Sequence, residues 1–272
     1  SREKVALPLE GPVVDTHCHM DVSFDESHVL PDVNSAMAAA KAVNVTKVIQ
    51  VGCDVASSKW AAETALNHPD VWATVALHPN ASAHDPNLDL SLAAIAELAE
   101  LPQVRGLGET GLDYYRTDKS MAAAQHVSFK AHIDIAKKVG KPIIIHDRDA
   151  HKDVIDTLQN YGCPEVVVFH CFSGDVQMAK ICADAGWYMS IPGVVTFKNA
   201  QQLKDAVQEI PDHLLLVETD SPYLTPAPNR GLANSAANIP WTVRAICEVR
   251  GQSEQEVCKN LFSNAARVFG PF

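Results

Sequence analysis

The feature that most constrains the fold of this chain is a regular alternation between short apolar, β-branched runs and longer stretches with helical periodicity. Such runs are typical of strands buried on both faces of a parallel sheet. The longer stretches carry helix signals, such as Pro31 at an entrance and Gly140 at an exit. The predicted strands are Val13–His19, Lys47–Gly52, Val71–Leu77, Val104–Glu109, Pro142–His146, Val166–His170, Trp187–Ile191 and Leu214–Asp220. The predicted helices are Asp32–Val43, Ser57–Asn67, Leu88–Leu101, Lys119–Val139, Ala150–Asn160, Val176–Ala185, Asn199–Glu209, Pro240–Val249 and Glu254–Phe269.

This order of elements predicts an α/β fold, a (β/α)8 TIM barrel, because strands and helices alternate without a linker or a change in composition. The chain has 272 residues, and barrels of this class run to about 250. We therefore expect a single domain over residues 1–272. The alternative is an open, doubly wound sheet, but no glycine-rich phosphate loop follows the first predicted strand.

Polar side chains stand where the apolar runs end. His17 and His19 are two residues apart, so on an extended strand they project from one face and can hold one ion together. The other strand-end residues of this kind are Glu109, His146, His170 and Asp220. In a barrel these positions fall on the C-terminal face, where barrel enzymes place their catalytic groups. The pattern predicts a divalent-metal site.

The size of this ligand set predicts two divalent ions. Four imidazoles and two carboxylates exceed what one tetrahedral ion with an open position can use. Glu109 is the natural bridge, with His17, His19 and Asp220 at one ion and His146 and His170 at the other. Mixed nitrogen and oxygen ligands favour Zn, Mn, Co or Ni over Mg and leave the metal open.

The remaining histidines fall in predicted helices or loops and are expected to be ordinary surface or capping residues; they are His28, His68, His84, His126, His132, His151 and His213. The seven cysteines include no C-x-x-C pair and are expected to be reduced packing residues.

Charge limits the partners that the chain can bind. With 22 Lys and Arg against 33 Asp and Glu, its formal net charge is −11, so no basic surface indicates a nucleic-acid or membrane partner. Local cations or bound metal must therefore hold any polyanion. No run has the length and apolarity of a membrane span or a signal peptide, and we expect a cytoplasmic protein.

Five motifs, in this order, resemble the signatures of the TatD family of metal-dependent deoxyribonucleases, a branch of the amidohydrolase-like barrels. They are His17-Cys18-His19-Met20-Asp21, Gly108–Tyr115, His146–Ala150, His170–Gly174 and Glu218–Leu224. The similarity extends from Val13 to Phe269. It implies a divalent-metal nuclease that removes nucleotides from DNA 3′ ends, with single-stranded ends as the expected substrate. It also implies phosphate or substrate contacts at His78, Arg116, Arg148 and Ser173, with Phe172 close to the bases.

The chain departs from the family pattern at two places. Many relatives carry a basic R-G-K-R-N-E-P loop after the last strand, whereas residues 229–235 here read N-R-G-L-A-N-S. Many also carry a second histidine after the histidine-proline pair, where Asn80 stands here. Both changes weaken the binding of a polyanion, so we expect weak, salt-sensitive binding to long DNA.

We expect hydrolysis of a phosphodiester by a metal-activated water, with Asp220 as the base and Glu109 where several related hydrolases carry a lysine. One alternative is a related ester or amide hydrolase, such as a D-aminoacyl-tRNA deacylase. Another is a non-enzymatic metal-bound interaction module, which the intact ligand set disfavours. The sequence is compatible with a monomer.

Overall fold

The structure is a computed structural model that describes residues 2–272. Eight strands within this range pair in sequence order, β1 to β8. They are β1 (Val13–Cys18), β2 (Val45–Val51), β3 (Val71–Val75), β4 (Val104–Asp113), β5 (Ile143–Arg148), β6 (Val167–Phe169), β7 (Tyr188–Ile191) and β8 (Leu215–Val217). The pairs β3–β4, β4–β5, β5–β6 and β7–β8 are parallel. The predicted (β/α)8 fold class is confirmed.

Helices follow the strands as the sequence predicts. They are α1 (Val33–Lys41), α2 (Val55–Asn67), α3 (Pro79–Ala83), α4 (Leu88–Ala99), α5 (Ala123–Val139), α6 (His151–Asn160), α7 (Val176–Asp184), α8 (Gln201–Glu209), α9 (Ile239–Arg250) and α10 (Glu254–Phe269). Side chains of Asp32, Asp54, Asp175 and Ser253 accept backbone hydrogen bonds at the starts of α1, α2, α7 and α10. These caps satisfy amide groups that have no partner inside the helix.

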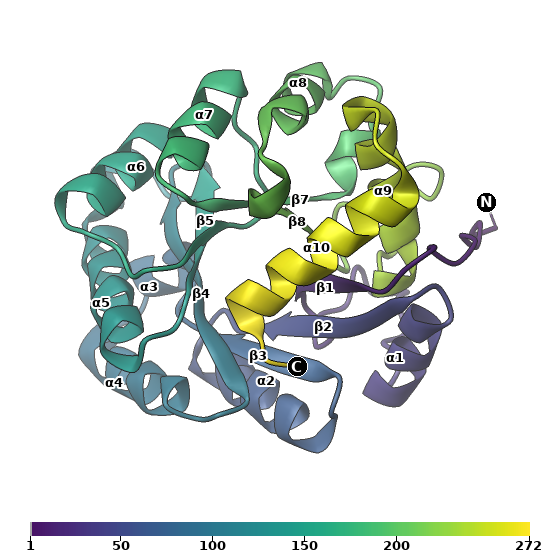
Figure 1. The fold of residues 1–272 in the computed structure, drawn as a ribbon. Coiled ribbons are helices and arrows are strands. Elements are labelled where there is room, and N and C mark those ends of the chain that lie inside the picture. Colours follow the sequence, from purple (N-terminus) through teal and green to yellow (C-terminus); the bar gives the residue numbers. More distant parts are fainter. Residues whose placement is uncertain (1) are drawn as a thin grey trace. The chain divides into compact units, whose positions relative to one another are not determined.

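The chain packs as two compact units, and the first contains the residues up to Ile49 together with Cys171–Phe272. In this unit α10 packs against β1, β8 and α9 (Figure 1). Strand β8 ends at Val217, earlier than expected. Asp220 has a φ of 55°, a left-handed conformation that a strand does not accommodate. The last polar residues of the predicted strand therefore form a loop.

The second unit is Gln50–His170. Here α5 packs against β4, and β4 is longer than predicted because it continues through Gly111 to pair Asp113 with Arg148. Gly111 has a φ of 142°, and a Cβ at this position would lie 2.1 Å from the carbonyl oxygen of His146. Only glycine permits this close approach of β4 to β5.

The structure can be compared with expectations about the cysteines, about one histidine and about membrane spans. The seven cysteines are thiols rather than disulfides, and Cys18, Cys182 and Cys258 are buried, in keeping with packing residues. The expectation for His132 is wrong, because it is 0% exposed, its Nε2 accepts the Leu77 N–H at 3.0 Å and its Nδ1 bonds the Ser128 carbonyl at 2.7 Å. Among the described helices, none has the length and apolar character needed to cross a membrane.

Candidate functional site

The first unit holds a polar cluster at the ends of β1 and β8, which we call the β1–β8 cluster: His17, His19, Glu218 and Asp220. Asp220 Oδ1 lies 3.6 Å from His17 Nε2 and 3.3 Å from His19 Nε2. The two imidazole rings meet edge to face, with centroids 5.1 Å apart. One carboxylate oxygen therefore faces two imidazole nitrogens, which is the chemistry of a divalent-metal ligand set.

Backbone hydrogen bonds hold this cluster together. Asp220 N–H donates to the His17 carbonyl at 2.8 Å, and His19 N–H donates to the Ser221 carbonyl at 2.9 Å. Asp15, which is 0% exposed, accepts from Thr219 N–H at 2.9 Å and from the Thr219 hydroxyl at 2.6 Å. Burial raises the pKa of Asp15 to about 7, against the opposing effect of the Thr219 hydrogen bonds.

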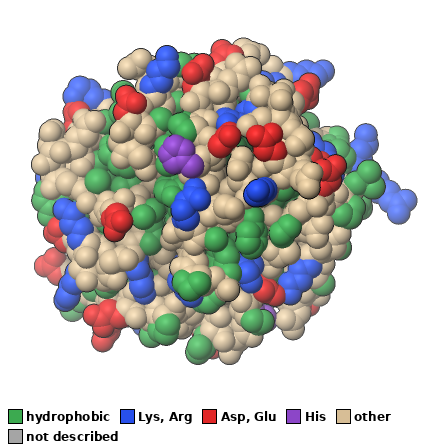
Figure 2. Space-filling model, viewed as in Figure 1, with side chains coloured by type: hydrophobic (Ala, Val, Ile, Leu, Met, Phe, Trp, Pro, Cys, Tyr) green, Lys and Arg blue, Asp and Glu red, His purple; other side chains and the backbone are tan. Residues whose placement is uncertain are grey.

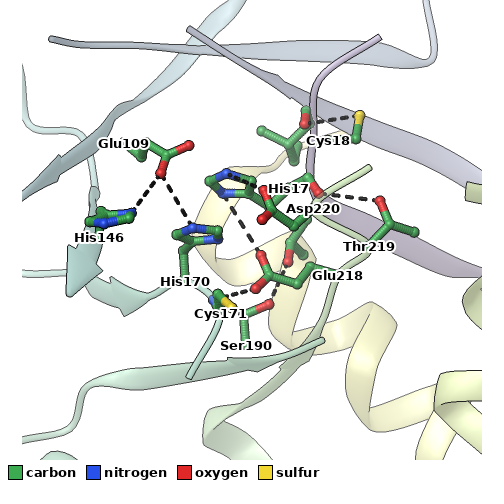
Figure 3. A network of polar contacts seen from close by, with 12 residues as sticks. His17, Cys18, Glu109, His146, His170, Cys171, Ser190, Glu218, Thr219 and Asp220 are labelled. Carbon is green, nitrogen blue, oxygen red and sulfur yellow. Dashed lines mark hydrogen bonds and ion pairs between the residues drawn. The ribbon is translucent and has the colours of Figure 1, made fainter. Parts of the chain in front are cut away.

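Glu218 supports His17 from the other side of the ring. Its Oε2 lies 3.8 Å from His17 Nδ1, and its Oε1 accepts the Cys171 N–H (Figure 3). At this distance the contact is electrostatic rather than a hydrogen bond, and it favours the ring orientation in which the other nitrogen faces a metal. In this cluster the nitrogen so directed is the Nε2 that faces Asp220.

The second unit holds what we call the β3–β6 cluster, made of residues within or just after those strands: His78, Glu109, Asp113, His146 and His170. Glu109 is at its centre, with Oε1 at 3.0 Å from His146 Nδ1 and 3.4 Å from His170 Nε2 (Figure 3). His78 Nε2 lies 3.4 Å from the same oxygen. Cys53 Sγ lies 3.7 Å from Oε2 of Glu109.

Asp113 orients His146 through a hydrogen bond, a closer contact than that between Glu218 and His17. Its Oδ2 lies 2.9 Å from His146 Nε2, and its Oδ1 accepts the N–H groups of Tyr115 and Arg116 at 3.0 and 2.9 Å. Burial acts to raise the pKa of Asp113, but the hydrogen bonds from His146 and Arg116 outweigh it and lower the pKa.

The same contacts shift the pKa values of the histidines. Burial acts to lower the pKa of His146, but its hydrogen bonds to Asp113 and Glu109 outweigh it and raise the pKa. Burial and the neighbouring His146 lower the pKa of His78 to about 3. The lowered pKa values leave His78 neutral and Asp113 ionised, the protonation states that bind metal, whereas His146 must lose its proton when a metal binds. Ligand atoms of His78, Asp113 and His146 lie within 4.8 Å of one another, a spacing that suits one ion.

Most of the substrate contacts implied by the resemblance lie on the surface. Arg116, Arg148 and Ser173 are exposed, and the guanidinium of Arg148 lies 3.7 Å from the centroid of the Tyr115 ring. His78 instead belongs to the β3–β6 cluster. Phe172 is only 2% exposed, so its ring packs in the core and is not presented to a base.

The sequence analysis does not identify Asp113 and Glu218, the carboxylates beside proposed ligands, or the Cys53 thiol beside Glu109. Asp113 and Glu218 lie inside motifs already noted, four residues after Glu109 and two before Asp220. The sequence signal that could have identified these two residues was a carboxylate inside a motif at the end of an apolar strand. No spacing pattern marked Cys53.

Comparison with known proteins gives the family. The family model described as "TatD related DNase" matches residues 14–270. The chain belongs to the TatD family. The resemblance seen in the five motifs is thereby confirmed.

Relatives in the TatD family match nearly the whole chain. A Mycobacterium tuberculosis protein named "Uncharacterized metal-dependent hydrolase TatD" is 42% identical over 262 residues, which is 95% of this chain and 98% of that protein. The Bacillus subtilis "Uncharacterized metal-dependent hydrolase YabD" is 36% identical, over 94% of this chain and 98% of its own length. The crystal structure of the Escherichia coli TatD homolog YJJV superimposes with a TM-score of 0.87 at 26% identity, covering 95% of this chain and 98% of that one.

Proposed function

We propose that this protein is a divalent-metal-dependent hydrolase that cleaves phosphodiester bonds as a 3′-5′ exodeoxyribonuclease. The observation that carries the proposal is the pair of carboxylates, Glu109 and Asp220, each faced by imidazole nitrogens within 3.6 Å. Two relatives of this chain are named metal-dependent hydrolases, and the family model that matches it is described as a DNase.

The two clusters divide into two ligand sets. His17, His19 and Asp220 would hold one ion, and Glu109, His146 and His170 a second. The bridging role of Glu109 stays a prediction. Nitrogen and oxygen donors suit Zn, Mn, Co or Ni and accept Mg less readily. When bound, such ions make water nucleophilic near neutral pH and stabilise negative charge on phosphoryl oxygens.

Asp220 is the proposed general base. Its side chain is 17% exposed, whereas the His17 side chain is 1% exposed, so this carboxylate can meet a water that enters from solvent. It accepts the proton of the attacking water, and the two imidazoles beside it keep the carboxylate in place. His78 stays neutral through its lowered pKa and can donate a hydrogen bond to a phosphate.

The exposed cations Arg116 and Arg148, with Ser173, are the proposed contacts to the nucleic-acid backbone. A guanidinium can bind a phosphate through two parallel hydrogen bonds. Because Arg148 is already stacked on Tyr115, its planar group is held in a fixed orientation. Tyr115 is 63% exposed and offers a ring on which a base can stack.

The test is digestion of a 5′-labelled single-stranded oligonucleotide with Mn or Mg, beside a sample with EDTA. A second arm uses the double variant His17→Ala with Glu109→Ala, and its matched control is His84→Ala with Glu97→Ala, two exposed positions. We expect a ladder that shortens from the 3′ end, lost with EDTA and in the first variant and kept in the control.

An intact oligonucleotide from metal-loaded protein would contradict the nuclease proposal. Release of the amino acid from a D-aminoacyl-tRNA under the same conditions would then assign the site to ester hydrolysis. If the first variant still digests the strand, the proposed ligand sets are wrong.

A further inference from the structure

A pocket of about 370 Å³ opens beside the β1–β8 cluster, within the first unit. Its wall is formed by the segment after β1, the first half of α1 and the segment after β8. His19 and Ser221 line the pocket, and His19 Nε2 is 3.3 Å from Asp220 Oδ1. A group that occupies the pocket is therefore next to the atoms proposed to carry out hydrolysis.

The lining of this pocket is largely apolar. Its apolar side chains are Met20, Val22, Leu30, Pro31, Ala36, Met37, Val48, Pro222, Leu232, Ala233 and Ala236. Among the described residues that line it, none is a lysine or arginine, and Glu3 adds a negative charge. A phosphate placed here would lose its hydration without gaining a cation, and burying an unpaired charge is strongly unfavourable. The pocket therefore selects an uncharged group.

Polar groups at the pocket are few and mostly engaged. The amide of Asn234 donates to the carbonyls of Thr219 and Tyr223 at 3.1 and 2.8 Å, so it supports the wall. His28 differs, because its Nδ1 accepts the Phe24 N–H at 3.0 Å. In the neutral ring the hydrogen is then on Nε2, which can donate to a carbonyl of a bound group.

We propose that this pocket binds the uncharged 3′-terminal nucleoside of a DNA strand and thereby restricts hydrolysis to strands that end in a free 3′-hydroxyl. Its size lies within the range of about 300–1,000 Å³ that small-molecule pockets occupy. The thioethers of Met20 and Met37 suit the faces of an aromatic base. A terminal nucleoside carries only the scissile phosphate, which lies on the His19 side, whereas an internal nucleotide would bring a second phosphate into the apolar wall. The inference rests on the proposed nuclease function.

Binding can be tested without turnover. The protein is labelled with ¹³C at its methionine methyl groups, loaded with Mg, and titrated with thymidine 5′-monophosphate and with thymidine 3′,5′-bisphosphate. We expect the signals of Met20 and Met37 to shift with the monophosphate, while those of Met178 and Met189 in the same unit, which do not line the pocket, stay constant. The bisphosphate should bind at least about tenfold more weakly.

Variants locate the effect in the pocket. Ala36→Phe on α1 fills it and should abolish the shifts of Met20 and Met37. Its matched control, Ala38→Phe on the same helix, is exposed and should leave them unchanged. Leu232→Arg places a cation in the wall, and we expect it to reduce the discrimination against a 3′-phosphate, both in bisphosphate binding and in digestion of an oligonucleotide with a 3′-phosphate.

The outcomes separate this proposal from the function on which it rests. Digestion by the wild type, together with no response of Met20 and Met37 to thymidine 5′-monophosphate, would overturn the pocket proposal and leave the nuclease standing. A shift of the Met20 and Met37 signals without digestion of DNA would support nucleoside binding and contradict the nuclease proposal. A response to hexanol but not to the nucleotide would overturn the proposal in favour of an aliphatic substrate.

Discussion

At the scale of single residues, two of the proposed ligands, His17 and His146, lie beside carboxylates that the motifs do not distinguish from ordinary strand residues. Glu218 supports His17, and Asp113 supports His146. The six proposed ligands could be predicted because histidine and acid side chains at the ends of apolar runs are unusual. Asp113 and Glu218 could not, because their roles depend on which ring nitrogen they face, and sequence spacing does not fix that.

Asp113→Asn should weaken metal binding while preserving the fold, because an amide oxygen still accepts the Tyr115 and Arg116 N–H groups. Loss of a carboxylate that orients a ligand lowers metal affinity by about 10- to 100-fold. Competition with a fluorescent zinc chelator measures this change. Asp153→Asn, which alters the acceptor of the Tyr114 hydroxyl, is the control. Equal zinc affinity in wild type and Asp113→Asn would show that Asp113 does not support a ligand.

Asp15 should make the metal-free protein lose stability as pH rises toward neutrality. Its pKa is raised to about 7 in the folded state, so the unfolded chain releases this proton at lower pH than the folded protein does. The free energy of unfolding should therefore fall between the ordinary aspartate pKa of about 4 and pH 7. Urea unfolding in EDTA at several pH values measures it. Asp15→Asn should flatten the profile over that interval, and an unchanged profile would contradict the assignment.

At the scale of elements, the sequence predicts the order of strands and helices well and their ends less well. Strand β8 ends at Val217, before Asp220 with its positive φ, and β4 is longer because Gly111 lets it continue. The sequence does not predict the short helix α3, since five residues that begin with a proline carry no periodicity. At β4 the backbone conformation of one residue, which sequence patterns do not reveal, allows the strand to extend.

Gly111→Ala should destabilise the protein strongly and disturb His146. The added Cβ would lie 2.1 Å from the His146 carbonyl oxygen, and we expect a loss of about 3 kcal/mol or more in the free energy of unfolding. Gly186→Ala is the matched control, because Gly186 also has a positive φ but open space around it. Its cost should be about 1 kcal/mol, from backbone strain alone. Equal losses in urea unfolding would refute a close contact between the strands.

At the scale of the whole molecule, charge limits how DNA can be held. The formal net charge is −11, and on the face in Figure 2 the lysine and arginine side chains are interspersed with acidic ones. We therefore propose that DNA is bound through the metal ions and a few local cations.

Binding to long DNA should therefore be weak and should fall further as salt rises from about 50 to 200 mM, since each neutralised phosphate releases counterions. Fluorescence anisotropy measures the affinity, with a labelled strand and a labelled duplex that are protected from cleavage by phosphorothioate linkages and with Mg present. Arg148→Gln should weaken binding and flatten the salt dependence, whereas Arg267→Gln, an arginine on α10 that contacts Tyr188, should not. Tight duplex binding at high salt would rule out this picture.

The wall of the apolar pocket depends in part on a short stretch, residues 232–236, that contains none of the proposed metal ligands. Changes in this stretch can therefore alter which substrate the protein binds while leaving the metal ligands that carry out hydrolysis in place. Randomising positions 232, 233, 235 and 236 while keeping Asn234, whose amide supports the wall, with selection on substrates that differ only in their end group, is therefore a practical route to re-engineered variants. In natural lineages, the same stretch is where divergence in substrate range should accumulate first.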